Sequence, residues 1–311
     1  MEAAHSKPVL ICVVGPTAIG KTRMAIDLAR YFKTEVISAD SRQFFKEMRI
    51  GTAVPRREEL AAVPHHFIQQ LSVNQEYSVG DFERDALQLL KELFKKHSVV
   101  VMAGGSGLYV DAVTKGLDKF PEVKEGIREA LNERLEKEGI ESLQQALKEA
   151  DPDYYKEVDL QNPQRLIRAL EVIQSSGKPF SSFRNQKAKE RFFDTVKVGL
   201  TADREIIYDR INKRVDIMMQ EGLLHEVKGL LDYKAFNALQ TVGYRELIAH
   251  LETDTTLEQA IAAIKQNTRR FAKRQLTWFK KDNQIHWFDY ESTANQVVAA
   301  LQAAYPGLGK D

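Results

Sequence analysis

The residues with the clearest chemical meaning lie near the amino terminus, in the run Gly15-Pro16-Thr17-Ala18-Ile19-Gly20-Lys21-Thr22. This run matches the phosphate-binding pattern G-x-x-x-x-G-K-[ST]. The glycines let the backbone wrap around phosphate groups, and the positive end of a following helix strengthens the attraction. Lys21 supplies a point charge, and the Thr22 hydroxyl is a suitable ligand for Mg²⁺. The run therefore predicts a site for a nucleotide or a diphosphate together with Mg²⁺.

The acidic residues near this loop leave several reactions open. Enzymes that hydrolyse ATP with such a loop usually hold Mg²⁺ with an acid at the end of a neighbouring strand. The strand-like run that precedes Gly104-Gly105-Ser106 ends without an acid, whereas Asp40 follows another strand-like run. Asp40 could serve as a metal ligand, as the base of a kinase or as the base for a different nucleophile. It could also be no more than a turn or helix-capping aspartate.

The phosphate-binding loop requires a strand before it and a helix after it, and the sequence supplies both. Val9–Val14 is a continuous apolar run, typical of a parallel strand that is buried on both faces, and an amphipathic helix is predicted from Lys21 to Phe32. Further strands are predicted at Glu35–Ala39, Val99–Ala103, Val196–Leu200 and Ile285–Phe288, and a further helix at Val79–His97. This alternation predicts an α/β fold, a P-loop core with a parallel sheet.

Strand patterns disappear between about Phe120 and Arg191, where the sequence predicts helices instead. The predicted helices of this segment are Glu122–Lys137, Ser142–Ala150 and Pro163–Ser175. Asn162 caps the last of them, and Gly177 ends it. We therefore expect a helical insertion domain at residues 120–191. Residues 1–119 and 192–311 would form the α/β core, with C-terminal helices at Arg204–Met219, Leu223–Leu231 and Leu257–Lys280.

The composition is that of an ordinary globular protein. Of the 311 residues, 43% are hydrophobic and 29% charged, which excludes a disordered or collagen-like chain. Lys and Arg number 45 against 44 acids, so any surface that attracts nucleic acid must be local. Cys12 is the single cysteine, which excludes an internal disulfide. No apolar run is long enough to span a membrane, and Met1–His5 does not resemble a signal peptide, so we expect a cytoplasmic protein.

Several short segments of the chain occur together, in the same order, in one enzyme family. They are Gly15–Thr22, Asp40-Ser41-Arg42-Gln43, Ile50–Ala53, His65–Ile68, Gly104–Tyr109, Gln164–Val172, Gly177–Pro179 and Thr268–Phe279. By these segments the chain resembles the tRNA dimethylallyltransferases, also called isopentenyl-diphosphate:tRNA transferases, over nearly its whole length. Eukaryotic members carry a C-terminal zinc finger, which a chain with Cys12 alone cannot form, so the resemblance is to the bacterial type.

This resemblance implies a specific reaction. The family transfers a dimethylallyl group from dimethylallyl diphosphate to N6 of adenosine 37, 3′ of the tRNA anticodon, and forms N6-(dimethylallyl)adenosine and diphosphate. It also implies that the loop Gly15–Thr22 cradles the diphosphate of the prenyl donor instead of ATP, with Mg²⁺ as cofactor beside Thr22. The expected partners are the anticodon stem-loop of tRNA and dimethylallyl diphosphate, with no membrane, and we expect a monomer.

The resemblance also assigns roles to individual residues. Asp40 would take the proton from adenine N6, a poor nucleophile because its lone pair is delocalised into the ring. Ser106 would bond the bridging oxygen of the diphosphate or a tRNA group; by itself it suits a turn. The residues implied in tRNA binding are Asp40, Ser41, Arg42, Gln43, Ser106, Arg128, Gln164, Arg165, Leu166, Ile167 and Arg168. Without the resemblance, the helix that carries Arg168 would be interpreted as a solvated face with an Arg168–Glu171 pair.

Other charged residues give weaker signals. Arg210 and Arg214 lie one helical turn apart and are candidates to meet the diphosphate, with ion pairs along the helix as the alternative. The segment Lys265–Lys281 has seven basic residues and no acid, which by itself favours a solvated helix face, whereas the resemblance implies contact with phosphates of the anticodon stem. Within it, Trp278 and Phe279 are interpreted as core residues. The pair His65-His66 favours structural packing over a metal site, because two neighbouring histidines need further ligands.

Three departures from the family pattern and three competing functions accompany this interpretation. Ser106 stands where the family commonly has Thr, Phe45 where it often has Tyr, and Val54 where it often has Lys.

The competing functions are a small-molecule kinase, a prenyltransferase for free adenine nucleotides and a non-catalytic RNA-binding protein. The missing acid before Gly104 disfavours the kinase, and the large insertion favours tRNA over a free nucleotide. The presence of Lys21, Thr22 and Asp40 disfavours a protein without catalysis.

Overall fold

The computed structural model describes residues 7–184 and 189–308, so the expectation for the segment Met1–His5 lies outside the described residues. The chain divides into two compact units, a smaller one at Gly116–Lys189 and a larger one that contains the rest. The insertion was expected at residues 120–191. Residues 116–119 therefore belong to the smaller unit, whereas Glu190 and Arg191 belong to the larger one.

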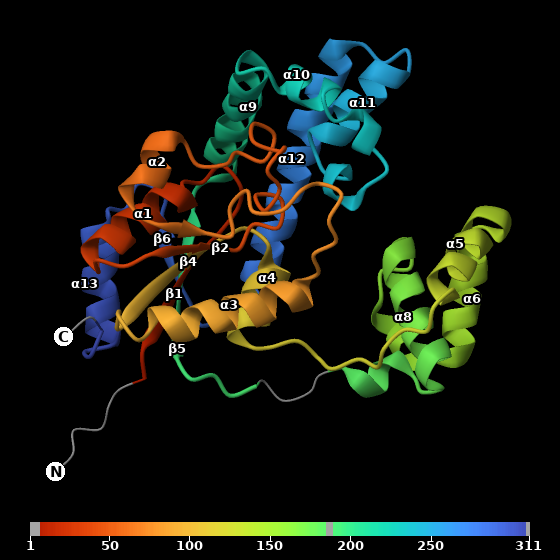
Figure 1. The fold of residues 1–311 in the computed structure, drawn as a ribbon, viewed down its shortest axis with the longest axis horizontal. Coiled ribbons are helices and arrows are strands. Elements are labelled where there is room, and N and C mark those ends of the chain that lie inside the picture. The colour runs from red at the N-terminus through yellow and green to blue at the C-terminus, as the bar shows by residue number, and fades with distance from the viewer. Residues whose placement is uncertain (1–6, 185–188, 309–311) are drawn as a thin grey trace. The chain divides into compact units, whose positions relative to one another are not determined.

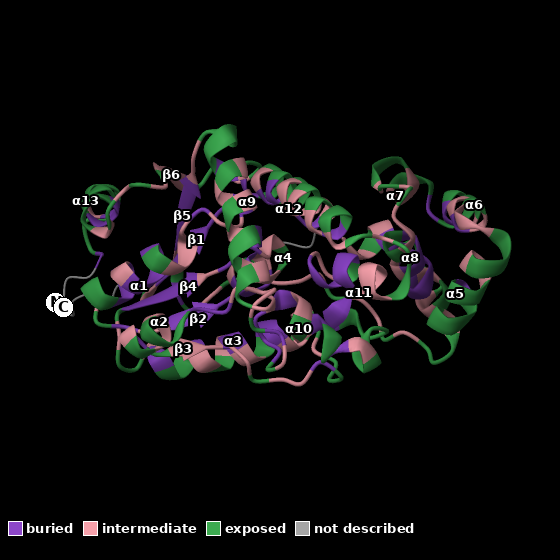
Figure 2. Cartoon of the chain, turned by 90° about the horizontal axis from the view of Figure 1, so that it is seen from above, coloured by how far each residue is buried: buried purple, intermediate pink, exposed green. Residues whose placement is uncertain are grey.

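The larger unit is built on a six-stranded parallel sheet with the strand order β3-β2-β4-β1-β5-β6 (Figure 1). The strands are β1 Val9–Val14, β2 Val36–Ser38, β3 His65–His66, β4 Val99–Ala103, β5 Asp194–Thr201 and β6 Ile285–Asp289. In β1, Leu10–Val14 are fully buried, as a central strand covered on both faces requires (Figure 2). The predicted α/β class with a parallel sheet and a P-loop is confirmed.

Helices cover both faces of this sheet. The helices of the larger unit are α1 Lys21–Tyr31, α2 Arg57–Ala62, α3 Val79–Leu93, α4 Gly107–Thr114, α9 Arg204–Gln220, α10 Leu223–Lys228, α11 Tyr244–Glu252, α12 Leu257–Phe279 and α13 Ala294–Ala304. On one face, Ile11 and Val13 of β1 pack into a core with α1 and α13. On the other face, Leu10 and Cys12 pack into a core with α3 and α4. The alternation of side chains along β1 thus separates two hydrophobic layers.

A third core holds the helices α9 to α12 together. It contains Val215 of α9, Leu223 of α10, Tyr244 of α11 and Ile264 of α12. Phe45, from the segment that follows β2, packs into the same core. This core therefore fixes the loop after β2 against the C-terminal helices, and short 3₁₀ turns at Leu231–Tyr233 and Asn237–Leu239 connect α10 to α11.

The smaller unit is wholly helical in its described residues. Its elements are α5 Ile127–Glu138, α6 Ile140–Ala150, α7 Pro152–Glu157, α8 Pro163–Ser176 and the 3₁₀ turn Phe180–Phe183. The predicted start of the first helix at Glu122 is wrong, because α5 begins only after Gly126, whose φ of 79° is incompatible with a helix. As predicted, Asn162 caps α8, and its side chain accepts a hydrogen bond from the Arg165 amide.

The parallel topology gathers the functional segments at one edge of the sheet. The phosphate loop (Gly15–Thr22) follows β1, Asp40 follows β2 and Ser106 follows β4, and these three strands are neighbours in the order β2-β4-β1. In open parallel sheets, ligands bind beyond the carboxyl ends of the strands. In the described part of the chain, every helix is too short or too polar to cross a membrane.

Candidate active site

A cavity of about 1230 Å³ lies at this edge of the sheet, and all of its lining residues belong to the larger unit. The phosphate loop contributes Lys21 and Thr22, and the segment after β2 contributes Asp40. Ser106 lines the cavity from the start of α4, and Arg214 lines it from α9. The structure therefore brings together residues that are far apart in the chain.

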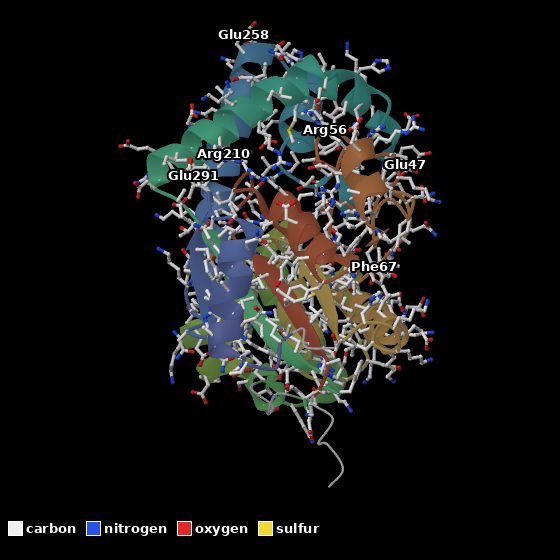
Figure 3. The ribbon with its side chains drawn as sticks, turned by 90° about the vertical axis from the view of Figure 1, so that its left-hand side faces the viewer. Glu47, Arg56, Phe67, Arg210, Glu258 and Glu291 are labelled. Carbon is white, nitrogen blue, oxygen red and sulfur yellow. The ribbon has the colours of Figure 1, made fainter. Side chains whose placement is uncertain are left out.

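The phosphate loop is held by backbone and side-chain contacts from two directions. Lys21 Nζ donates to the Pro16 carbonyl oxygen at 2.7 Å. Ala18 has a φ of 63°, a left-handed conformation that is uncommon outside glycine. Arg210, labelled in Figure 3, belongs to α9. Its Nε donates to the Ala18 carbonyl oxygen at 2.8 Å, and its guanidinium lies 5.0 Å from the ring centre of Tyr290. In this structure Arg210 thus stabilises the backbone of the phosphate loop through the hydrogen bond to Ala18.

Three charged groups face one another inside the cavity. Burial lowers the pKa of Lys21 to about 8; the negative charge of Asp40 opposes this shift, and the positive charge of Arg214 adds to it. Burial also lowers the pKa of Arg214, and Asp40 again acts in the opposite direction. Two cations whose charged forms are poorly solvated would be stabilised by an anionic ligand between them. The electrostatics therefore favour a polyanion such as a diphosphate.

The turns that follow the neighbouring strands β2 and β4 contact each other through Ser41 and Ser106. Asp40 Oδ1 accepts a hydrogen bond from the Arg42 amide at 3.1 Å, which fixes the carboxylate in a turn. The Ser41 amide donates to Ser106 Oγ at 3.3 Å, and the hydroxyl groups of Ser41 and Ser106 lie 3.4 Å apart. Asp40, Ser41 and Ser106 all line the cavity. The turn contact engages one carboxylate oxygen of Asp40, and a carboxylate has a second oxygen that can accept a substrate proton.

Arg42 and Gln43 line the cavity, but both side chains are bonded within the protein. Arg42 donates to the carbonyl oxygens of Asn237 and Ala238 at 2.7 and 3.4 Å, and burial lowers its pKa. Gln43 is 9% exposed, and its amide nitrogen donates to the carbonyl oxygens of Thr52 and Ala53. In this structure the two side chains fix the loop after β2, whereas the resemblance implied tRNA contacts.

The residues predicted in the helical unit divide into exposed and buried ones. Gln164 and Arg165 are exposed, whereas Leu166 and Ile167 are 0% exposed in the core of this unit. The side chains of Leu166 and Ile167 are thus not available at the surface, because the apolar face of α8 packs inward, and their assignment to the tRNA-binding segment stays a prediction. Their role is to hold the helix that presents the polar face.

A buried carboxylate organises two of the predicted tRNA contacts. Glu171 is 1% exposed and forms ion pairs with Arg128 of α5 and Arg168 of α8. The two guanidinium groups remain partly exposed, with 49% and 42% of their side chains accessible. The Arg168–Glu171 pair is thus present, and it does not remove Arg168 from the surface. Arg128 and Arg168 form one basic group around Glu171.

Helix α12 contributes more to the cavity than its sequence indicated. Trp278 is 40% exposed and lines the cavity, so its interpretation as a core residue is wrong. Phe279 is 4% exposed, so its interpretation as a core residue is confirmed. Trp278 Nε1 donates to Asp111 of α4 at 3.0 Å, which holds the ring over the start of that helix. Of the basic residues, Arg274 lies over the ring of Phe271 at the cavity, and Lys265 pairs with Asp216 of α9.

Sequence reasoning also missed a carboxylate that orders the cavity wall. Glu226 of α10 accepts hydrogen bonds from the amides of Arg49, Ile50 and Gly51 and from the Tyr244 hydroxyl. It thereby holds the segment Ile50–Ala53 that the family resemblance had singled out. No motif surrounds Glu226 in the sequence, and only the fold brings it to this loop.

The histidine pair lies away from the cavity. His66 contacts Glu35 at 2.6 Å, and His65 Nδ1 lies 2.8 Å from the Val63 carbonyl oxygen, so both imidazoles pack at the far end of β2 and β3. Among the described residues, no group of three or more His, Cys, Asp or Glu side chains could hold a metal ion.

The cavity nevertheless offers a suitable position for Mg²⁺. This ion usually keeps several waters and takes only one or two protein oxygens, with substrate phosphates completing its shell. Thr22, the residue that follows Lys21 in the first turn of α1, lines the cavity. Its oxygen chemistry therefore fits a Mg²⁺ ion that arrives with a diphosphate.

The comparisons with known proteins agree with this geometry. A family model described as IPP transferase matches residues 43–282 of the chain. The chain belongs to the IPP transferase family. It is 60% identical to the tRNA dimethylallyltransferase of Christiangramia forsetii, with 94% of this chain and 97% of the relative covered. It is 56% identical to the tRNA dimethylallyltransferase of Flavobacterium johnsoniae, over 93% and 96% of the two chains.

Solved structures of IPP transferase relatives match the fold over nearly the whole chain. The tRNA isopentenylpyrophosphate transferase of Bacillus halodurans has a TM-score of 0.71 at 36% identity and covers 97% of this chain and 96% of its own. A eukaryotic dimethylallyltransferase acting on tRNA has a TM-score of 0.81 at 25% identity, with coverages of 96% and 79%. The resemblance to this family is confirmed, and bacterial relatives cover both units.

Proposed function

We propose that this protein transfers a dimethylallyl group from dimethylallyl diphosphate to N6 of adenosine 37 in tRNA. The products are N6-(dimethylallyl)adenosine and diphosphate. The observation that carries the proposal is the convergence of Lys21, Arg214 and Asp40 in one cavity, which combines an anion site with a base. Relatives that cover nearly the whole chain are described as tRNA dimethylallyltransferases, which supports tRNA as the acceptor.

The step that this geometry supports is a substitution at the first carbon of the dimethylallyl group. The bond between N6 and this carbon forms while the bond from the carbon to the diphosphate oxygen breaks, and the N6 proton passes to Asp40. A carboxylate is a suitable acceptor because N6 becomes acidic only as the new bond forms. The Arg42 amide holds one oxygen of Asp40, so the carboxylate keeps its orientation during the step.

The leaving diphosphate gains negative charge as its bond breaks, and the cavity provides groups to stabilise it. Lys21, Arg214 and the amides of the phosphate loop would bind this charge, and Ser106 would donate to the bridging oxygen or to the tRNA. Thr22 would hold Mg²⁺. When bound, this ion neutralises part of the charge of the leaving group.

The helical unit would bind the tRNA backbone. Gln164 and Arg165 are exposed on α8, and Arg128 and Arg168 present partly exposed guanidinium groups around Glu171. Arginine forks of this kind suit phosphate oxygens. We propose that the reaction takes place in the cytoplasm and that the protein acts as a monomer.

The proposal is tested by incubating unmodified tRNA with the protein, dimethylallyl diphosphate and Mg²⁺, followed by mass spectrometry of the nucleosides. We expect adenosine to gain the mass of one dimethylallyl group. A parallel reaction with free AMP separates the tRNA enzyme from one that prenylates free nucleotides. Modified AMP with unmodified tRNA, or transfer of phosphate from ATP, would contradict the proposal.

A further inference from the structure

One buried polar side chain connects two parts of the active site that are far apart in the sequence. Gln275 lies on the buried face of α12, between Ala272 and Phe279, and is 6% exposed. Its Oε1 accepts a hydrogen bond from the amide of Thr17 in the phosphate loop at 2.8 Å. Its Nε2 donates to the carbonyl oxygen of Gly105 at 2.9 Å. A single amide thus bridges the phosphate loop and the Ser106 turn (Gly104–Gly107).

The two partners determine the orientation of this amide. A backbone N–H can only donate and a backbone carbonyl can only accept, so the oxygen of Gln275 must face Thr17 and its nitrogen must face Gly105. An apolar side chain of similar size would fill the space, but it would leave both backbone groups without these partners. An unpaired buried donor or acceptor is unfavourable, and the loops would shift to find new partners. The geometry therefore specifies a carboxamide.

Gly105 packs directly against the side chain of Gln275, which leaves no room for a Cβ atom at this position. A Cβ atom added at Gly105 would lie 2.2 Å from Gln275 Nε2 and 3.5 Å from Lys21 Nζ. Only glycine can therefore approach the amide so closely without displacing the side chain of Gln275 from its two hydrogen bonds. The 3.5 Å between this Cβ position and Lys21 Nζ shows that the Ser106 turn lies next to the side chain of Lys21. The bridge therefore lies beside the phosphate-binding lysine.

We propose that Gln275 is a positioning residue that holds the phosphate loop and the Ser106 turn at a fixed separation. This inference rests on the proposed function, in which the phosphate loop holds the leaving diphosphate, Asp40 accepts the N6 proton and Ser106 donates to the bridging oxygen or to the tRNA. Transfer requires the acceptor nitrogen and the leaving oxygen to lie on opposite sides of one carbon. A misplacement of about 1 Å can cost about 100-fold in rate, so the bridge contributes through alignment.

Three substitutions on α12 test the bridge. Gln275→Leu removes both hydrogen bonds without adding a charge. Gln275→Glu keeps the acceptor for Thr17, but its ionised form cannot donate to Gly105, whereas its protonated form can. Gln259→Glu is the matched control, because Gln259 is exposed on the same helix outside the basic segment Lys265–Lys281, and a Glu oxygen can still accept the hydrogen bond from the Thr256 amide. Single-turnover prenylation, inorganic diphosphate affinity and tRNA affinity are measured from about pH 5.5 to 8.5, a range in which a buried carboxyl group titrates.

We expect Gln275→Leu to lower the single-turnover rate about 10- to 100-fold at every pH. Gln275→Glu should lose as much at high pH and recover toward the wild-type rate as pH falls. Each rate is divided by the wild-type rate at the same pH, so the pH dependence of the rest of the site, including that of Lys21 beside the bridge, cancels. Affinity for tRNA should change by less than about twofold, because the bridge lies beside the diphosphate site. Gln259→Glu should resemble the wild type.

A wild-type rate for Gln275→Leu would overturn the inference, as would a loss in Gln275→Glu that does not recover at low pH. If Gln275→Leu does not fold, the recovery of Gln275→Glu decides the question by itself. Failure of the wild-type protein to modify tRNA would contradict the proposed function and not this bridge. Inorganic diphosphate binding would then still test it, with weaker binding to Gln275→Glu at high pH and recovery at low pH.

Discussion

At the scale of single residues, the site depends on which groups can accept or lose a proton. Asp40 is held by the Arg42 amide and faces the cations Lys21 and Arg214. Lys21 differs from an exposed lysine because burial lowers its pKa to about 8. The charge states of these residues should therefore control prenyl transfer and donor binding separately.

Replacing Asp40 by Asn should slow the chemical step with little effect on donor binding. The amide has nearly the same shape as the carboxylate but cannot accept the N6 proton, and loss of a general base typically costs about 10²- to 10⁴-fold. Single-turnover rates and donor affinity are measured across a Mg²⁺ titration. Recovery of the rate at high Mg²⁺ would instead identify Asp40 as a metal ligand, as the kinase hypothesis requires.

The affinity of the donor should depend on pH through Lys21. Only the protonated amine attracts the diphosphate, and in the free protein it loses its proton as pH rises through about 8. The lysine contribution to affinity is therefore complete below this pH and falls above it by up to about tenfold per pH unit. The ratio of wild-type to Lys21→Ala affinity measures this contribution, because titration of the ligand cancels. A ratio that stays constant from about pH 7 to 9.5 would contradict the role.

At the scale of secondary-structure elements, buried polar groups connect helices that the hydrophobic pattern alone would leave free to slide. Glu171 ties α5 to α8, and Glu226 ties α10 to the segment Arg49–Gly51. Such groups cost desolvation, and they are favourable only when their partners are in place. They therefore specify relative positions of elements more than they add stability.

Replacing Glu171 by Gln should weaken tRNA binding, although it removes a negative charge. Electrostatics alone would predict tighter binding to RNA, whereas loss of the anchor should leave Arg128 and Arg168 poorly positioned. We expect unfolding to become easier by only about 1–2 kcal/mol, because both arginines are partly exposed and screened by water.

The matched control for this substitution is Glu133→Gln, which removes an exposed carboxylate from α5, where Glu133 pairs with Lys137. This control should leave tRNA affinity unchanged or slightly higher. Both affinities can be measured by fluorescence anisotropy at several salt concentrations. Equal or tighter tRNA binding by the Glu171→Gln variant than by the wild type would contradict the anchoring role.

At the scale of the whole molecule, the chain separates two binding tasks between two compact units. The cavity belongs to the larger unit, and the basic group around Glu171 belongs to the smaller one. Substitutions on the basic surface of the smaller unit should therefore affect tRNA and leave donor binding nearly unchanged.

The double substitution of Arg165 and Arg168 by Ala should raise the KM for tRNA and reduce its salt dependence. Two charges within reach of phosphates are lost, so the slope of log affinity against log salt should fall by about 2. Inorganic diphosphate should bind as before. The control replaces Lys137 and Lys148, two exposed lysines of the same unit, and removes the same net charge. An unchanged KM, or an equal effect of the control, would contradict a role of α8 in tRNA binding and would identify its polar face as a solvated surface.

The sequence predicted the sheet well but not the shorter elements. The long apolar runs of β1, β4 and β5 were recognised because burial on both faces requires continuous hydrophobicity. Helix α4 was missed because it begins with Gly107, and β3 was missed because it has only two residues, His65 and His66. Elements of this length are stabilised by their neighbours and carry little pattern of their own.

The sequence by itself predicted the phosphate loop and placed Asp40 and Ser106 after strands, whereas the roles of these two residues were implied only by the family resemblance. These signals are local, since a strand, a turn and a helix start in direct succession impose the residue types. Tertiary structure alone decided that Arg42 and Gln43 bond inside the protein and that Leu166 and Ile167 are buried. It also decided that Gln275 bridges Thr17 and Gly105. The physical reason is that a hydrogen bond between residues 258 positions apart depends on the packing of α12 against the sheet edge, which leaves no spacing pattern in the chain.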